Sequence, residues 1–217
     1  MPVRAVGHHG HNFIGYFPSI KLQRQVGWES LLEQDYYYLI DILREVLRYE
    51  EQPLRIPYTV KGKPRHYTPD VLLIMRSGQR VLVEVKPQKF VDTPANQLKF
   101  VAARRWCAEN NDQFKIMTER DIRWGVRLTN VKKLTQFARH TVSQAMRGRI
   151  HAALLSAYSG QTIDALAHAV SPSDPKDALV AIYHLAFHGE IVMGLDDRRI
   201  SGATTVWLPF QPAVAKG

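Results

Sequence analysis

The sequence predicts an α/β fold in which helices flank a mixed β-sheet, followed by a smaller C-terminal domain. Three observations support this prediction. Two segments with helical periodicity enclose three short apolar segments with strand character, a further strand-like segment follows the second helix, and residues 141–217 change to mostly helical patterns.

The first 60 residues predict an arm, a helix and a strand. Residues 1–28 are rich in Gly and His with scattered aromatic residues, which indicates an extended arm. An amphipathic helix is expected from about Ser30 to Leu47, because apolar residues recur at steps of three and four. These residues are Leu31, Leu32, Tyr36, Leu39, Ile40, Leu43 and Leu47. The first strand is expected at residues 54–60.

Two further strands are expected at residues 66–76 and 80–87. The turns before them are predicted at Gly62-Lys63-Pro64 and Ser77-Gly78-Gln79, because Gly and Pro favour tight turns. Three strands joined by two short turns favour an antiparallel meander.

A second amphipathic helix is expected from about Pro94 to Asn110, with another strand at residues 113–118. Such a helix can cross over and lay the following strand into the same sheet. Short helices are expected near residues 119–123 and 129–139. The order helix, three strands, helix, strand is typical of a mixed sheet flanked by helices.

The C-terminal region predicts three helices, at residues 141–158, 162–169 and 175–188. The third has Ser173 or Asp174 as N-cap, Pro175 at its first position and Gly189 beyond its end. Strands at 190–195 and 204–209 flank a polar turn at 196–199. Three helices followed by a β-hairpin form the layout of a winged-helix domain, a helix-turn-helix variant. We therefore expect an arm at 1–28, an α/β domain at 29–140 and a winged-helix-like domain at 141–217.

Composition excludes several classes of protein. The chain has 217 residues, of which 45% are hydrophobic and 23% charged, which is typical of a globular protein and unlike a disordered or fibrous one. No apolar run approaches the roughly 18 residues of a membrane helix, and the N-terminus lacks the apolar core of a signal peptide. A cytoplasmic protein without a membrane partner is expected. The single cysteine, Cys107, excludes an internal disulfide and is expected to be a buried helix residue.

The positive charge is concentrated in the first two thirds of the chain. The net charge is +9, and residues 1–140 carry 23 Lys and Arg against 14 Asp and Glu, whereas residues 141–217 carry six of each. The cationic field that attracts a polyanion such as DNA therefore belongs to the first 140 residues.

The residues that point to a chemical reaction lie on two adjacent predicted strands. Asp70 follows Pro69, and Glu84 and Lys86 flank Val85. Side chains alternate along a strand, so Glu84 and Lys86 project from one side. Mg²⁺ prefers carboxylate oxygens and water, and Asp70 and Glu84 offer two carboxylates, with the Val85 carbonyl as a further ligand.

This set fits the hydrolysis of a phosphodiester bond. A divalent cation generates hydroxide near neutral pH, and Lys86 can orient the attacking water and neutralise developing charge. The alternative is that these are ordinary hairpin charges, with Glu84 paired to Lys86 or Lys89. The strongly apolar flanking segments favour the functional interpretation, because charges embedded in them are costly unless a ligand satisfies them.

Other candidates carry less weight. His8, His9 and His11 favour a solvated arm over a metal site, and Glu50 and Glu51 favour solvated or ion-paired roles. Gln88 and Gln97 are candidate accessories of the site. Four basic residues are candidates for phosphate contacts or, alternatively, the polar face of the second helix: Lys89, Lys99, Arg104 and Arg105. Two arginines at the predicted wing tip are candidates for a DNA groove or for a protein contact: Arg198 and Arg199.

A helix glutamate, then PD, then ExK in a hairpin resembles the PD-(D/E)XK nuclease superfamily, which implies a restriction-endonuclease-like fold. The following runs are more narrowly similar to the TnsA endonuclease family, over roughly residues 15–140: FPSIK, WESLLEQDYYYLIDI, YEEQPLRIPY, YTPD, VEVKP and MTERDIRWGVRLTNVKKL. In that family a helix glutamate completes the metal site. The resemblance therefore implies that Glu33, with Glu29 as the fallback, joins Asp70, Glu84 and Lys86 in catalysis.

The resemblance also implies a biological role. It is the cutting of double-stranded DNA at the 5′ ends of a mobile element, with Mg²⁺ as cofactor and Mn²⁺ as an expected substitute. The implied partners are a TnsB-like transposase and a TnsC-like AAA+ ATPase. Two alternatives stay open, namely a stand-alone phage or restriction-type nuclease, and a winged-helix DNA-binding regulator with an inactive nuclease-like domain.

Overall fold

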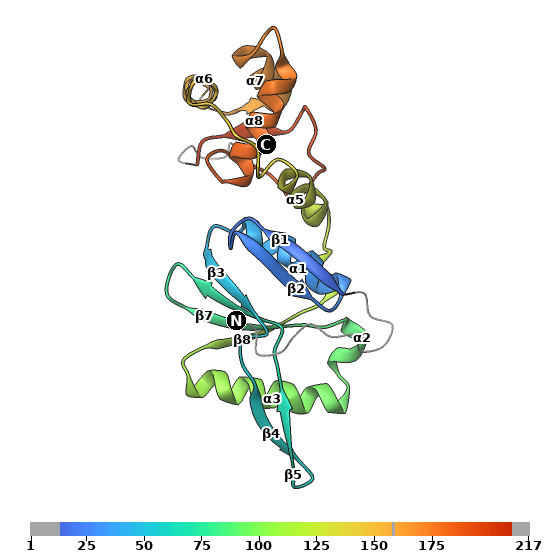
Figure 1. The fold of residues 1–217 in the computed structure, drawn as a ribbon. Helices are drawn as coiled ribbons and strands as arrows, with labels where there is room; N and C mark the ends of the chain where they lie inside the picture. Colours follow the sequence, from blue (N-terminus) through green and yellow to red (C-terminus); the bar gives the residue numbers. More distant parts are fainter. Residues whose placement is uncertain (1–13, 158, 210–217) are drawn as a thin grey trace. The chain divides into compact units, whose positions relative to one another are not determined.

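The computed structural model describes residues 14–157 and 159–209 of the chain (Figure 1). Contacts divide the chain into two compact units, Met1–Trp124 and Gly125–Gly217. Each unit is described by itself. Among the helices of the described residues, none combines the length and the apolar character that a membrane crossing requires.

The first unit is built on a four-stranded sheet with the order β3-β6-β7-β8. Neighbouring strands are antiparallel for β3/β6 and β6/β7 and parallel for β7/β8, which confirms the predicted mixed sheet. The strands span Val46–Glu51 (β3), Val71–Met75 (β6), Arg80–Val85 (β7) and Gln113–Met117 (β8).

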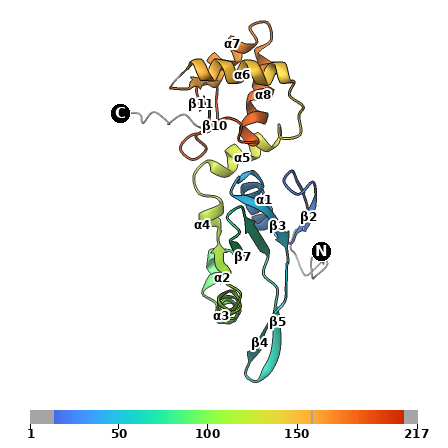
Figure 2. The ribbon, with the colours of Figure 1, turned by 90° about the vertical axis from the view of Figure 1, so that its left-hand side faces the viewer.

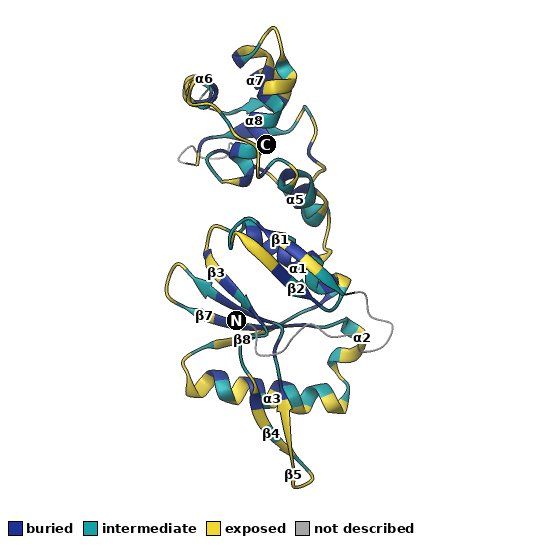
Figure 3. Ribbon diagram, in the orientation of Figure 1, coloured by how far each residue is buried: buried dark blue, intermediate teal, exposed yellow. Residues whose placement is uncertain are grey.

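Helices flank this sheet. They are α1 (Leu31–Ile42), α2 (Gln88–Val91), α3 (Pro94–Glu109) and α4 (Glu119–Ile122). Ala103 and Cys107 of α3 pack on Leu72 and Leu82 of the sheet, which confirms the expected buried helical cysteine. Figure 2 shows α3 nearly end-on, and Figure 3 shows that only part of its surface is buried. The helix after Pro94 and its crossover to β8 were correctly predicted.

The first helix is shorter than predicted. It ends at Ile42, because Leu43 adopts an extended backbone conformation, and the chain continues as strand β3. Helical spacing extends to Leu47, but Leu47 is 48% exposed and Val46 and Tyr49 are buried instead. The prediction of a helix up to Leu47 is therefore wrong, because the apolar residues after Ile42 belong to a strand and not to the helical repeat.

The predicted antiparallel meander is wrong. Strands β4 (Ile56–Val60) and β5 (Lys63–Tyr67) form a separate two-stranded ribbon. Its turn is Lys61-Gly62, both with positive φ, which is the backbone of a type I′ hairpin rather than the expected turn at 62–64. The segment 66–76, expected as one strand, is divided between β5 and β6.

The N-terminal segment is not an extended arm throughout. Residues 15–28 form a hairpin of strands β1 (Gly15–Ser19) and β2 (Arg24–Trp28). Phe17 and Val26 are buried, and the Phe17 ring lies 5.9 Å from that of Tyr37 in α1. Burial of these apolar side chains is the physical reason for the difference. Residues 1–13 of the predicted arm, with His8, His9 and His11, lie outside the described residues.

The second unit contains helices and a small three-stranded sheet with the order β10-β11-β9. Asp174 caps α8 and Pro175 opens it, as predicted from the sequence. The elements are α5 (Arg127–Thr135), α6 (Gln144–Ser156), β9 (Gln161–Thr162), α7 (Ile163–Val170), α8 (Pro175–Phe187), β10 (Val192–Met193) and β11 (Thr205–Trp207).

The expected limit of the α/β domain at residue 140 differs from the division after Trp124. Asn130 of α5 explains the difference. Its side-chain amide donates to the carbonyls of Leu195 and Arg198, and its Oδ1 accepts from the Ile200 N–H. Because these partners satisfy a buried side chain, residues 125–140 belong to the second unit.

Candidate active site

The candidate site lies where β6 begins and β7 ends. The antiparallel register pairs Val71 with Val83, so Asp70, the residue before β6, is placed across from Glu84, the residue after Val83 in β7. Lys86 lies two residues beyond Glu84 and shares its face of the strand. The local register thus places together the three residues that the sequence singled out.

Asp70 is fixed by backbone hydrogen bonds on both sides of its residue. Its Oδ2 accepts a hydrogen bond of 2.7 Å from the Val85 N–H, and its carbonyl accepts one of 2.8 Å from the Gln52 N–H. No hydrogen bond to Oδ1 is found among residues 14–157 and 159–209. One oxygen of Asp70 is therefore available to a ligand.

Glu84 is buried, and both of its oxygens have partners. Oε1 lies 2.7 Å from the ammonium of Lys86, and Oε2 accepts a hydrogen bond of 2.6 Å from the Tyr67 hydroxyl. The pairing of Glu84 with Lys86 is the ion pair that the simpler interpretation expected. The sequence analysis missed Tyr67, since only its place at the end of the strand before Asp70 signals a role.

Glu33 lies in the first turn of α1, which begins after the N-cap Ser30. The Ser30 hydroxyl donates to Glu33 Oε1 at 2.8 Å, and the Glu29 N–H donates to Oε2 at 3.0 Å. The Glu33 N–H in turn donates to the Ser30 hydroxyl. Both oxygens of Glu33 thus cap the start of the helix. Glu29, the fallback residue, accepts from the side-chain amide of Gln52 at 3.2 Å.

A cavity of about 470 Å³ joins these groups. It is lined by Glu29, Arg55, His66, Tyr67, Thr68, Asp70, Glu84, Lys86 and Lys99. Of the residues predicted from the sequence, the cavity brings together Asp70, Glu84, Lys86 and Lys99. Glu33 is not among the residues that line it. Arg55 and His66 were missed, because neither belongs to a motif.

Negative charge accumulates around Asp70. Burial raises the pKa of Asp70 well above its ordinary value, and the charges of Glu84 and Glu33 raise it further, against the Lys86 ammonium and the Val85 N–H. Burial also raises the pKa of Glu33. For Lys86, burial lowers the pKa, but the carboxylates of Glu84 and Asp70 outweigh it, so the net shift is upward. Lys86 is therefore charged at neutral pH but does not balance the acids alone.

The donors at the site are carboxylate oxygens, which are the ligands that a hard divalent cation prefers. In the part of the chain that the structure describes, no group of three or more His, Cys, Asp or Glu side chains is arranged to hold a metal ion. Mg²⁺ is commonly held by one or two carboxylates together with water and substrate phosphate. The free oxygen of Asp70 and the unbalanced charge around it meet that description.

Val85 has a part in the site that the sequence analysis did not assign. Its side chain is buried on the other face of the strand, and its N–H holds Asp70 in place. The prediction that its carbonyl binds metal stays a prediction.

The four candidate DNA-binding residues are separated in the structure. Lys99 lines the cavity, whereas Lys89 is exposed with its ammonium 4.8 Å from the ring of Phe90. Arg104 is exposed and lies 5.8 Å from the ring of Phe114. Arg105 forms a 2.8 Å ion pair with Glu109 and lines a different cavity. Only Lys99 is therefore placed at the acids.

The remaining polar candidates have structural partners. Gln88 donates its backbone N–H to Glu119, and the side chain of Gln97 donates to the Val91 carbonyl. Glu51 is paired with Arg24 at 2.5 Å and Glu50 lies 3.5 Å from Arg48, as the expected ion-paired roles require.

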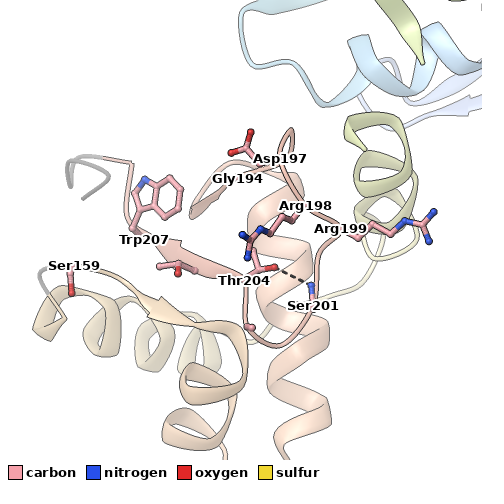
Figure 4. A pocket seen from close by; sticks show the side chains of 10 residues that line it. Ser159, Gly194, Asp197, Arg198, Arg199, Ser201, Thr204 and Trp207 are labelled. Carbon is pink, nitrogen blue, oxygen red and sulfur yellow. Dashed lines mark hydrogen bonds between the residues drawn. The ribbon is translucent and has the colours of Figure 1, made fainter. Parts of the chain in front are cut away.

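A second cavity, of about 650 Å³, lies in the second unit (Figure 4). It is lined by Ser159, Gly194, Asp197, Arg198, Arg199, Ser201, Ala203, Thr204, Thr205 and Trp207. Arg198 lies beside Thr204, whereas Arg199 points away from it. The cavity holds one carboxylate and no lysine, so it lacks the acid pair that metal-dependent hydrolysis needs.

Comparison with known proteins gives a family match for the segment that carries the acids. Residues 43–119 match the family described as TnsA-like endonuclease N terminal. The match includes Asp70, Glu84 and Lys86 and leaves out Glu33. Among curated proteins, no significant match is found.

We predict that Asp70→Asn stabilises the metal-free protein at neutral pH. A carboxyl group whose pKa is raised by folding weakens the folded state once it ionises, so the destabilisation is absent below about pH 4 and grows as pH rises toward the folded-state pKa. Asn keeps an oxygen for the Val85 N–H. The free energy of unfolding should therefore be higher for the variant than for the wild type at neutral pH, because burial and the charges of Glu84 and Glu33 no longer act on an ionisable group.

Urea unfolding of both proteins in chelator at pH 4 and pH 8 measures this gain. The difference between them should be larger at pH 8. Equal stabilities at pH 8, or a less stable variant, would contradict the electrostatic description of the site.

Proposed function

We propose, from the premise that residues 43–119 form a TnsA-like endonuclease domain, that the chain is a Mg²⁺-dependent DNA endonuclease. Its substrate is double-stranded DNA at the 5′ ends of a mobile element, where it hydrolyses phosphodiester bonds. The observation that carries the proposal is the placement of Asp70 opposite Glu84, with Lys86 2.7 Å from Glu84, in one cavity.

Asp70 and Glu84 are the proposed metal-binding residues, with the Val85 carbonyl as a candidate third ligand. When bound, a divalent cation supplies a Lewis acid and a water of lowered pKa. Asp70 offers its free Oδ1, and Glu84 offers Oε1 once Lys86 turns toward the phosphate. Tyr67 holds the other oxygen of Glu84 and thereby sets the direction in which the carboxylate points.

Lys86 and Lys99 are the proposed cationic residues of the reaction. The ammonium of Lys86 is charged and stands at the end of a long side chain, so it can orient the attacking water and stabilise negative charge on the phosphate oxygens. Lys99 lines the same cavity and can hold a neighbouring phosphate. Lys89, Arg104 and Arg105 remain candidates for contacts further along the DNA.

A helix acid completes the proposed site, and two residues compete for this role. Glu33 is the residue that the family resemblance favours, but it must release its helix-capping hydrogen bonds to reach a metal ion. Glu29 already lines the cavity. The charge of Glu33 nevertheless acts on Asp70, so it remains a proposed ligand.

The second unit is proposed to be a winged-helix-like domain. Helices α6, α7 and α8 followed by the short strands β10 and β11 support this assignment. With equal numbers of acidic and basic residues in 141–217, it is suited to protein contacts as well as to DNA. We propose that the chain works as a subunit of a heteromeric transposase, with a TnsB-like transposase and a TnsC-like AAA+ ATPase.

One observation favours a second candidate function, a DNA-binding regulator whose nuclease-like domain is inactive. The ion pair between Glu84 and Lys86 and the Tyr67 hydrogen bond satisfy Glu84 without a metal ion. Such a protein would bind DNA and would not cut it under any metal condition.

We predict that Glu84→Gln lowers the rate of Mg²⁺-dependent DNA nicking at least about 100-fold while DNA affinity is unchanged. Loss of a residue in the outer shell of a metal site costs about 10- to 100-fold, and loss of a ligand should cost no less. The assay is nicking of supercoiled plasmid, with binding measured in Ca²⁺. Glu45→Gln, the same change at an exposed position, is the control. Equal rates for Glu84→Gln and wild type would refute the assignment.

Metal binding should also raise thermal stability. We predict that saturating Mg²⁺ or Mn²⁺ raises the Tm of the wild-type protein, because a ligand at about 100 times its Kd stabilises the folded state by about 2.7 kcal/mol. Asp70→Asn should lose this increase. Comparison of Glu33→Gln with Glu29→Gln by the same measurement identifies the third acid. An increase that survives in Asp70→Asn would place the ion elsewhere.

Activity should depend on partner subunits. We predict weak or absent cutting by the isolated chain, and cutting at element ends when the neighbouring transposase and ATPase are added with Mg²⁺. The readout is the position of 5′ cleavage on a labelled end fragment. Strong cutting by the isolated chain would instead indicate a stand-alone phage or restriction-type nuclease.

A further inference from the structure

The β4–β5 ribbon, residues 55–67, is largely exposed. Among the described strands, β4 and β5 pair only with each other, and Figures 1 and 2 show the tip of the ribbon extending beyond α3. Figure 3 shows β5 as largely exposed. Only its base is buried, where Ile56 and Tyr67 pack with residues of the sheet and α3. The ribbon is thus an anchored projection that buries little at its tip.

The charge on the ribbon is of one sign. It carries Arg55, Lys61, Lys63 and Arg65, and no Asp or Glu occurs between Gln52 and Asp70. All four basic residues are exposed, and within residues 14–157 and 159–209 none of them forms an ion pair. Four cations on a narrow projection create a positive potential that attracts a polyanionic partner.

The base of the ribbon is part of the active-site cavity. Arg55 and His66 line the cavity, and Tyr67 donates to Glu84. Asp70 follows only three residues after the ribbon ends. A molecule held along the ribbon therefore reaches the acids.

The edges of the ribbon argue against a protein strand as its partner. Pro57 and Pro64, one in each strand, lack an N–H and remove a donor from each free edge. Proline and lysine on exposed edges are typical of ribbons that avoid strand addition. Charge and edge chemistry together favour nucleic acid.

We propose that the ribbon grips duplex DNA by its phosphates next to the scissile bond. Alternation puts Lys63 and Arg65 on the face of the ribbon opposite to Arg55 and His66, which line the cavity. The major groove of DNA admits a two-stranded ribbon. Cations on both faces of the ribbon can then contact the phosphates of both strands that border the groove. This proposal rests on the proposed function, because duplex DNA is the substrate that the ribbon would position.

The test compares two triple variants of the full chain. Lys61→Gln, Lys63→Gln and Arg65→Gln alter the ribbon, whereas the control variant, Arg48→Gln, Arg76→Gln and Lys115→Gln, removes three exposed charges elsewhere in the same unit. Fluorescence anisotropy with a 30-base-pair duplex, across a salt series in chelator, gives the slope of log K against log salt. Circular dichroism melts compare the folding of both variants with the wild type.

The ribbon variant should bind about tenfold more weakly, and its salt slope should be shallower by about 2 to 3, since each lost phosphate contact contributes about 0.9. The control variant should keep most of the wild-type slope. Equal slopes for the ribbon variant and wild type, or an equal loss in both variants, would overturn the proposal. The measurement is made without metal, so it is independent of whether the chain cuts DNA.

A second experiment gives a positive signal. The described cysteine, Cys107, is buried, so Lys63→Cys provides one reactive exposed thiol for an iron chelate. Strand scission of bound duplex by the tethered chelate is expected at Lys63→Cys and not at the control Lys115→Cys. If Lys63→Cys gives no more scission than the control, the ribbon does not lie on the DNA and the proposal is wrong.

Discussion

The candidate site depends on two carboxylates that two adjacent antiparallel strands bring into one cavity, one just before β6 begins and one near the end of β7. Asp70 and Glu84 are the first charged residues beyond an apolar pair, Leu72 and Leu82, which is packed beneath α3. The apolar layer holds the two strands together beneath the acids. Burial and the charges of Glu84 and Glu33 raise the pKa of Asp70, and the Lys86 ammonium and the Val85 N–H act against that increase.

The core of the site could be predicted from the sequence, because it depends on local rules. Strand alternation places Glu84 and Lys86 on one face, and a short turn makes the two strands neighbours. The third acid could not be fixed in this way. Glu33 and Glu29 lie on a helix start whose hydrogen bonds decide which carboxylate turns toward the cavity. Tyr67 was missed for a similar reason, since no motif records which hydroxyl reaches Glu84.

The fold was predicted correctly where the spacing of apolar residues fits only a helix or only a strand, and incorrectly where it fits both. The helix after Pro94 and the strand after it form as expected. Residues 43–51 carry apolar residues at spacings that suit both a helix and a strand, and pairing with β6 decides for the strand. The ribbon between them and β6 was assigned to the sheet, because sequence alone does not reveal that two strands pair only with each other. The pairing of strands that are distant in the sequence thus decides the secondary structure and the strand partners where the local sequence pattern does not.

The proposed function requires that Asp70 and Glu84 bind one divalent ion. The most direct measurement is the anomalous scattering of Mn²⁺ soaked into crystals of the full chain. The account predicts one peak at bonding distance from the carboxylates of Asp70 and Glu84, with the ammonium of Lys86 displaced from Glu84. A crystal that binds no Mn²⁺ there, with the Glu84–Lys86 ion pair intact at a saturating concentration of the ion, would contradict it.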